Sequence, residues 1–242
     1  MKKTFVLLFA LSILLSNAQD WKSREKVKGN GKEITISKTT TEYDGIEAGG
    51  FFDVELVSGK EGNIKIKGEE NLLKFINIEV NNNLLKIYID KSKQLECSNN
   101  KKIVITVPFD KIDTIKFSGS GDVYTQTKIS SPSLELKLTG SGDMRIDTDA
   151  EKVAASLVGS GDILLSGKTT DLDLNLAGSG DIDSKNLLAN NAKAKVAGSG
   201  DIKVNSTGKL SATVSGSGNI QYKGKPDNVN KVVNGSGSIT SY

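Results

Sequence analysis

Aspartate follows a Gly-Ser-Gly segment five times along the chain, and this regular spacing is the feature with the clearest chemical consequence. The five carboxylates are Asp122, Asp143, Asp162, Asp181 and Asp201. If successive copies stack like neighbouring strands, unit charges about 4.8 Å apart repel by about 1 kcal/mol in water, and by several-fold more at a lower dielectric. Hydrogen bonds or a bound cation must therefore offset this repulsion.

Two interpretations of the aspartate row follow. In the first, each carboxylate accepts backbone N–H groups at its corner, as aspartate does in turns, and flanking lysines screen the remaining charge. In the second, calcium ions lie between the carboxylates, as in glycine-rich nonapeptide repeats. Those repeats have half this period, and here the last two copies carry Asn219 and Ser238 instead of aspartate. We therefore expect hydrogen bonds and no cofactor, with calcium at the five aspartates as the alternative.

The residue types do not indicate a catalytic site. The chain has no histidine, and arginine occurs only at Arg24 and Arg145. A polysaccharide-cleaving β-helix needs an acid–base pair, or calcium with a strong base, grouped in a cleft. Here the carboxylates are evenly repeated instead. We expect no enzyme, no catalytic residues and no cofactor-binding residues, and a carbohydrate-active β-helix enzyme is the weaker alternative.

The elements that position the aspartates are the glycine segments themselves. The residue two places before the first glycine and the residue four places after it are apolar in all seven copies, and mostly polar residues alternate with them. Such alternation predicts strands with one buried face. A fixed period near 19 residues predicts a solenoid. The first glycines are Gly119, Gly140, Gly159, Gly178, Gly198, Gly216 and Gly235.

We therefore predict an all-β fold, a parallel and right-handed β-solenoid of about seven coils of roughly 19 residues over residues 112–242. Each coil has two strand segments, one on either side of its glycine corner. Both corner glycines are expected on the inward face, where a tight bend or a close approach of layers excludes a side chain. Apolar ladders that include Val123, Ile163 and Ile202 should form the core.

The chain before the repeats divides into three parts. Residues 1–18 combine two lysines, an apolar run and a final Ser-Asn-Ala, which is typical of a removed export signal. Residues 19–42 are expected to form a polar tether with one strand at 33–37. Residues 43–111 are expected to form a small, mainly antiparallel β cap over the first coil. No later segment is apolar enough to cross a bilayer.

Residues from about 43 to 242 resemble the head-GIN domain family, described as putative auto-transporter adhesins. The matching features are GFFDVELVSG (50–59), ITVP (105–108), the serial GSGD corners and GSGNIQYKGKP (216–226). The resemblance implies an exported bacterial protein with a β-helical repeat region, located in the periplasm or on the cell surface. It brings no catalytic or binding residues to this chain.

Together these features predict a non-catalytic protein of the cell envelope that binds a glycan or an envelope protein through the solenoid surface. A calcium-stabilised structural module is the alternative. Without Lys2 and Lys3, 30 basic and 29 acidic residues leave a net charge of +1, which gives no electrostatic reason to bind nucleic acid. The ends of a solenoid expose strand edges, so oligomers could form through them.

Overall fold

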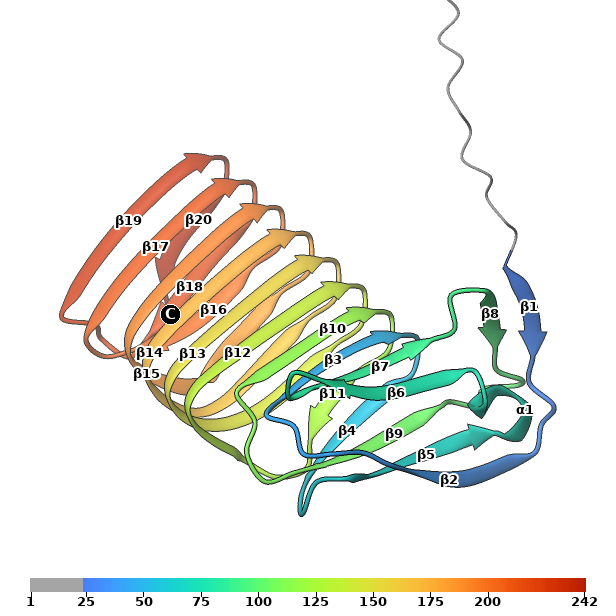
Figure 1. Cartoon of the computed structure of the whole chain (residues 1–242). Helices are drawn as coiled ribbons and strands as arrows, with labels where there is room; N and C mark the ends of the chain where they lie inside the picture. The colour runs from blue at the N-terminus through green and yellow to red at the C-terminus, as the bar shows by residue number, and fades with distance from the viewer. Residues whose placement is uncertain (1–23) are drawn as a thin grey trace, which may run out of the picture.

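The glycine corners stack in register along one edge of a parallel β-solenoid, seen as the row of bends in Figure 1. The structure is a computed structural model that describes residues 24–242. Gly119, Gly140 and Gly159 are paired neighbours in this stack, and the pairing continues to Gly235. The predicted all-β solenoid of about seven coils of about 19 residues is thus confirmed.

Each coil contributes one segment before its corner and one after it. The long strands β13 (Met144–Gly159), β14 (Ile163–Gly178) and β15 (Ile182–Gly198) supply the segment after one corner and continue around the opposite bend to the next corner. The strands of these coils are β10 (Thr114–Gly119), β11 (Val123–Thr125), β12 (Ile129–Gly140), β13 (Met144–Gly159), β14 (Ile163–Gly178), β15 (Ile182–Gly198), β16 (Ile202–Ser206), β17 (Lys209–Gly216), β18 (Asn219–Lys223), β19 (Asn228–Gly235) and β20 (Ser238–Ser241).

Two sheet faces result, and the candidate site lies on one of them. We call the outward side of residues 133–139, 152–158, 171–177, 191–197, 209–215 and 228–234 the pre-corner face. The outward side of the segments after the corners is the post-corner face. Between the faces lie the two predicted apolar columns, which are buried in every coil before the last. They comprise Phe117, Leu138, Leu157, Leu176, Val196 and Val214, and Val123, Met144, Ile163, Ile182, Ile202 and Ile220.

The corner glycines are required by contact between coils, along the stack. A Cβ atom on Gly178, whose φ is +136°, would overlap the carbonyl oxygen of Gly159 in the preceding coil. A Cβ atom on Gly180 would overlap the carbonyl of Gly161 in the same way. The expected close approach is thus one between the backbones of successive coils, and Gly180 is buried while Gly178 is half-buried.

The stack continues into the cap region. Strands β3 (Gly45–Gly50) and β4 (Asp53–Ser58) form one further coil, in which Gly50 pairs with Gly119. Strands β7 (Leu84–Ile89) and β9 (Val104–Phe109) lie parallel to them in the next layer. Within residues 24–242, the antiparallel pairs are β2 (Glu33–Thr39) with β5 (Asn63–Glu69), β5 with β9, and β6 (Ile76–Asn81) with β7. The expected antiparallel cap is therefore a mixed one.

Residues 24–42, placed in a tether by the sequence, contribute strands to this cap. Strand β1 (Glu25–Lys28) pairs with β8 (Lys93–Glu96), and β2 pairs with β5. The one-turn helix α1 (Glu70–Leu73) buries Leu72 and Leu73. The predicted export signal at 1–18 lies outside the described residues. Across residues 24–242, no helix has both the length and the apolar character needed to span a bilayer.

Candidate functional site

The five predicted aspartates lie in one column at the corners, where each is hydrogen-bonded to the next. The backbone N–H of each ladder residue donates to the side-chain Oδ1 of the residue one coil earlier. From Asp143 to Asp201 these N···O distances are between 2.9 and 3.3 Å. We call this column, from Asp53 through the five aspartates to Asn219 and Ser238, the aspartate ladder.

The ladder compensates for a gap in backbone pairing at the corner. The carbonyl oxygen of Gly119 accepts two N–H groups of the next coil, from Ser141 at 3.0 Å and Gly142 at 3.2 Å. The N–H that follows, that of Asp143, donates to the Asp122 carboxylate instead. The Asp122 carboxylate therefore supplies an acceptor that the neighbouring backbone does not offer to this partly buried N–H. Each of the five carboxylates accepts a backbone N–H at the corner, as the hydrogen-bonded interpretation expects.

The ladder begins with a residue that the sequence interpretation missed. Asp53 accepts the N–H of Asp122 at 3.0 Å, and its other oxygen lies 2.9 Å from Lys102 Nζ. Phe51 and Phe52 stand here in place of the usual Ser-Gly, so the GSG pattern hides this corner. The recognisable signal is Gly-Gly at 49–50 followed by Asp-Val at 53–54, which repeats the spacing of the later corners.

Calcium would need more ligands than this ladder presents. Ca²⁺ takes six to eight oxygen ligands, whereas one oxygen of each aspartate is already committed to the next coil. The second oxygen of Asp143 also accepts a bond from Arg145 at 2.9 Å. Within residues 24–242 no group of three or more His, Cys, Asp or Glu side chains is placed to hold a metal ion. Calcium at Asp122, Asp143, Asp162, Asp181 and Asp201 stays an untested alternative.

The pre-corner face carries a shallow groove of about 650 Å³ that crosses the strands from β12 to β19. Register pairing places its polar side chains in rows along the stack. One row runs through Ser133, Lys152, Asp171, Asn191, Lys209 and Asn228. A second hollow of about 400 Å³ lies beside it, closer to the corners, and is lined by Ser156, Asn175, Ala177, Lys195 and Thr213 among others.

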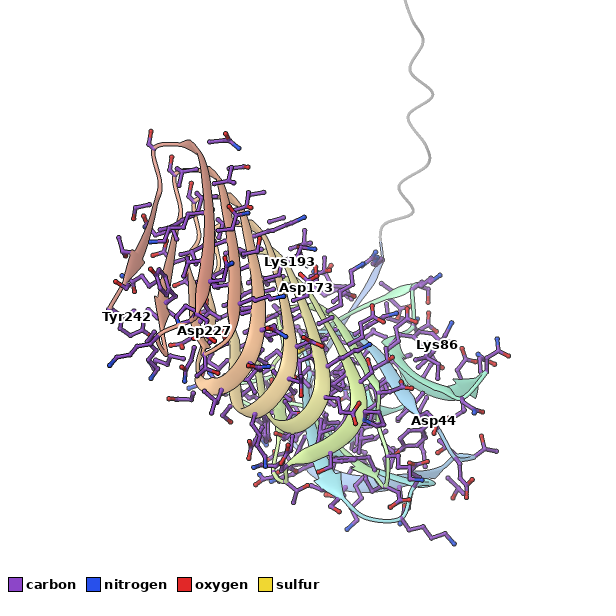
Figure 2. The ribbon with its side chains drawn as sticks, turned by 90° about the vertical axis from the view of Figure 1, so that its left-hand side faces the viewer. Asp44, Lys86, Asp173, Lys193, Asp227 and Tyr242 are labelled. Atoms are coloured by element: carbon purple, nitrogen blue, oxygen red, sulfur yellow. The ribbon has the colours of Figure 1, made fainter. Side chains whose placement is uncertain are left out.

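Hydrogen bonds hold several side chains of this face in place. Asn191 Nδ2 donates to Asp171 Oδ1 of the preceding coil at 3.0 Å. Asp173 accepts from Asn175 at 3.0 Å and lies 3.3 Å from Lys193 Nζ. Figure 2 shows Asp173 and Lys193 together on the outside of the stacked strands. The face therefore presents preorganised donors and acceptors to solvent.

Small side chains and an apolar rim give the groove its shape. Ala154, Ser156 and Ser211 stand outward between the longer polar residues. Closer to the corners, Val158, Ala177 and Ala197 form an exposed row of register partners, with Val158 43% exposed. A ligand that lies along the stack would meet polar rows and a narrow apolar strip at once.

Comparisons with known proteins show similarity over most of the chain. A family model described as "Putative auto-transporter adhesin, head GIN domain" matches residues 42–226. A crystal structure of a "putative adhesin" from Bacteroides fragilis has 30% sequence identity and a TM-score of 0.83, and covers 89% of this chain and 100% of that chain. A search of curated proteins found no match.

Two further crystal structures come from Parabacteroides species. A "putative lipid binding protein" from Parabacteroides distasonis has 26% identity and a TM-score of 0.74, covering 90% of this chain and 100% of that one. A "putative adhesin" from Parabacteroides merdae has 23% identity and a TM-score of 0.71, covering 90% of this chain and 99% of that one, which shows a shared fold.

Proposed function

Because the chain belongs to the head GIN domain family of "putative auto-transporter adhesins", we propose that it is an exported, non-catalytic envelope protein that binds a glycan or a surface protein on its pre-corner face. The family and the Bacteroides fragilis structure are described as "putative" adhesins, and one Parabacteroides distasonis structure as a "putative lipid binding protein"; these descriptions support a binding role. The solenoid serves as a rigid scaffold for the outward side chains.

The groove that crosses the coils is the observation that carries this proposal. Its polar rows repeat at the strand spacing of about 4.8 Å, so an extended ligand can make similar contacts on successive coils. Lysine, asparagine, aspartate and serine side chains provide both donors and acceptors. These groups suit a ligand rich in hydroxyl and amide groups better than the acyl chain of a lipid.

Export supports the same role. The N-terminal residues 1–18 have the pattern of a removed signal, and an adhesin must reach the outside of the cytoplasmic membrane to act. Periplasm and cell surface are both compatible with this proposal. Cell fractionation combined with N-terminal mass spectrometry tests it: a mature protein that begins near Gln19 in an exported fraction is expected, and an uncleaved cytoplasmic protein would contradict export.

Binding to arrayed glycans and to immobilised envelope and host-matrix proteins tests the function. Ala154→Arg and Ser211→Arg place a long charged side chain in the groove without entering the core. Leu164→Arg is the matched control, because Leu164 is 39% exposed on the post-corner face. We expect the wild type and the control to bind, and the two groove variants to bind at least about tenfold more weakly, a loss of about 1.4 kcal/mol.

Three results would contradict the proposal. The first is that the wild type binds no arrayed glycan or protein, whether calcium or a chelator is present. The groove variants could bind as well as the wild type. Release of cleaved products from an arrayed polysaccharide would replace the binding role with an enzymatic one.

A further inference from the structure

A separate groove of about 760 Å³ lies where the cap meets the first coil, and no part of the proposed function uses it. We call it the cap groove; its lining includes Glu47, Gly49, Phe51, Glu79, Tyr88 and Lys91. It shares no lining residue with the two grooves of the later coils. Its volume is in the range of sites that bind small ligands, about 300 to 1,000 Å³.

Gly49 lines the cap groove, and the stacking of the coils does not require glycine at this position. Gly49 lies in register between Tyr88 of β7 and Ser118 of β10. Its φ lies outside the left-handed region, and an added Cβ atom would come closest to the Ser118 hydroxyl, at 2.9 Å. The corner glycines, by contrast, exclude a Cβ atom because of backbone. The missing side chain at position 49 leaves a hollow beside the Tyr88 ring.

The same place is where the repeat changes its residue type. Serine follows the first glycine in all seven GSG corners, but Phe51 holds that position in the β3–β4 coil. Phe51 packs against the core and is only partly buried. Phe51 and Tyr88 therefore give the groove two aromatic rings with accessible surface. Aromatic faces of this kind stack on the apolar C–H face of a pyranose ring.

Charged groups of both signs surround these rings. Glu47, Glu79 and Lys91 are exposed at the groove, and Glu79 Oε1 accepts a 3.4 Å hydrogen bond from the Tyr88 hydroxyl. In the described part of the chain, Glu47, Lys86 and Lys91 make no ion pair, so these groups are available to ligand hydroxyls.

The position of the groove disfavours an extended peptide. Strand β3 is paired on both sides, to β7 and to β10, so its backbone offers no free edge for strand addition. A ligand must be recognised by side chains alone, through an aromatic platform and neighbouring donors and acceptors. These are the requirements of a sugar.

We propose that the cap groove binds a short oligosaccharide, with one sugar ring stacked on Tyr88 above Gly49 and its hydroxyl groups bonded to Glu47, Glu79 and Lys91. This inference rests on the proposed function, because it treats the chain as a binding protein and names a ligand class. It adds a second site, at the end of the solenoid where the cap lies.

An array of defined oligosaccharides of two to six units tests the inference, with titration calorimetry on the strongest binder. Tyr88→Ala removes the platform, and Gly49→Leu fills the floor; each should weaken binding at least tenfold. Tyr88→Phe keeps the ring and should retain affinity within about threefold. Tyr124→Ala, on β11 after the corner, is the tyrosine control and should bind like the wild type. Circular dichroism and melting confirm that each variant is folded.

The outcomes separate this site from the groove on the pre-corner face. Binding that is lost in Tyr88→Ala and Gly49→Leu, but kept in Tyr124→Ala and Ala154→Arg, supports the cap groove. No binding to any arrayed oligosaccharide overturns it. Binding that survives both cap-groove variants and is lost in Ala154→Arg also overturns it, while leaving the proposed function in place.

Discussion

The backbone N–H of Asp181 donates to Oδ1 of Asp162, one coil earlier, at a distance of 3.0 Å. The same relationship joins Asp201 to Asp181 at 2.9 Å and Asn219 to Asp201 at 2.8 Å. Each carboxylate therefore completes the backbone pairing of the following coil. The most regular chemical feature of the sequence is part of the scaffold that supports the two outward faces of the solenoid.

Replacing Asp162 separates the acceptor role from the charge. Asp162→Ala leaves the Asp181 N–H without its protein partner at an exposed corner and should destabilise the protein by about 0.5 to 1.5 kcal/mol. Asp162→Asn keeps Oδ1 as an acceptor and removes a like charge, so its stability should equal or exceed that of the wild type. Asn219 already performs this role, accepting the Ser238 N–H at 3.1 Å. Urea unfolding of the three proteins measures the difference; equal losses in both variants would contradict the account.

Alanine at a corner glycine should be far more harmful than alanine at a loop glycine. Gly178→Ala combines a positive φ with an overlap against the Gly159 carbonyl and should cost about 2 to 4 kcal/mol. Gly59→Ala is the control, because its Cβ atom would meet only Pro108, at an ordinary 3.7 Å. Thermal melting compares the two variants, and a tolerated Gly178→Ala would argue against tightly stacked corners.

A buried carboxylate in the cap makes stability depend on pH. Glu69 is fully buried and accepts hydrogen bonds from the Ser98 N–H at 2.8 Å, the Ser98 hydroxyl at 2.6 Å and the Gly31 N–H at 2.6 Å. Burial by itself raises the pKa of Glu69, but these hydrogen bonds and nearby Lys101 lower it overall. A lowered pKa in the folded state means that ionised Glu69 stabilises the cap above the unfolded pKa, about 4.3.

Glu69→Gln tests this dependence. The stabilisation from Glu69 is lost as the pH falls through its folded pKa, so the stability gap between wild type and Glu69→Gln should be largest above about pH 5 and should narrow in acid. Urea unfolding at a series of pH values measures the gap. Glu70→Gln, at an exposed carboxylate that pairs with Lys32, is the control and should show a much smaller gap. A Glu69→Gln gap that widens in acid would contradict the assigned sign.

Calcium removal should leave the stability unchanged. A structural calcium ion present at 100 times its Kd would add about 2.7 kcal/mol and raise the melting temperature by about 5 to 10 °C. Because the ladder oxygens are already bonded to backbone N–H groups, we expect equal melting temperatures in excess calcium and in chelator. A calcium-dependent increase that disappears in an Asp143→Asn and Asp162→Asn double variant would instead favour the calcium-stabilised module.

The repeated part of the fold could be predicted because its determinants are local. The columns that contain Ile163 and Leu176 follow from period-two alternation, and the stack follows from the fixed interval between corners. The hydrogen-bonding role of Asp162 follows because aspartate side chains in turns accept hydrogen bonds from nearby backbone N–H groups. These features depend on residues within one coil and on the same residues of its neighbour.

The cap and the grooves could not be predicted in the same way. Strand β3 lies between β7 and β10. Its two partners are distant from it in the chain and flank it on either side. Phe52 occupies the position of a second corner glycine, which hid the β3–β4 coil. The cap groove arises where Tyr88 and Ser118 flank Gly49, a juxtaposition that no spacing in the sequence reveals.

Amide hydrogen exchange, resolved residue by residue by NMR, tests the central claim that stacked corners are held by the aspartate ladder. In the wild type, the N–H groups of Asp143, Asp162, Asp181 and Asp201 should all exchange slowly. Asp162→Ala should accelerate exchange at Asp181 far more than at Asp143, while Asp162→Asn leaves both protected. Rapid exchange of all four amides in the wild type, or an Asp162→Ala variant in which Asp181 stays as protected as before, would contradict the claim.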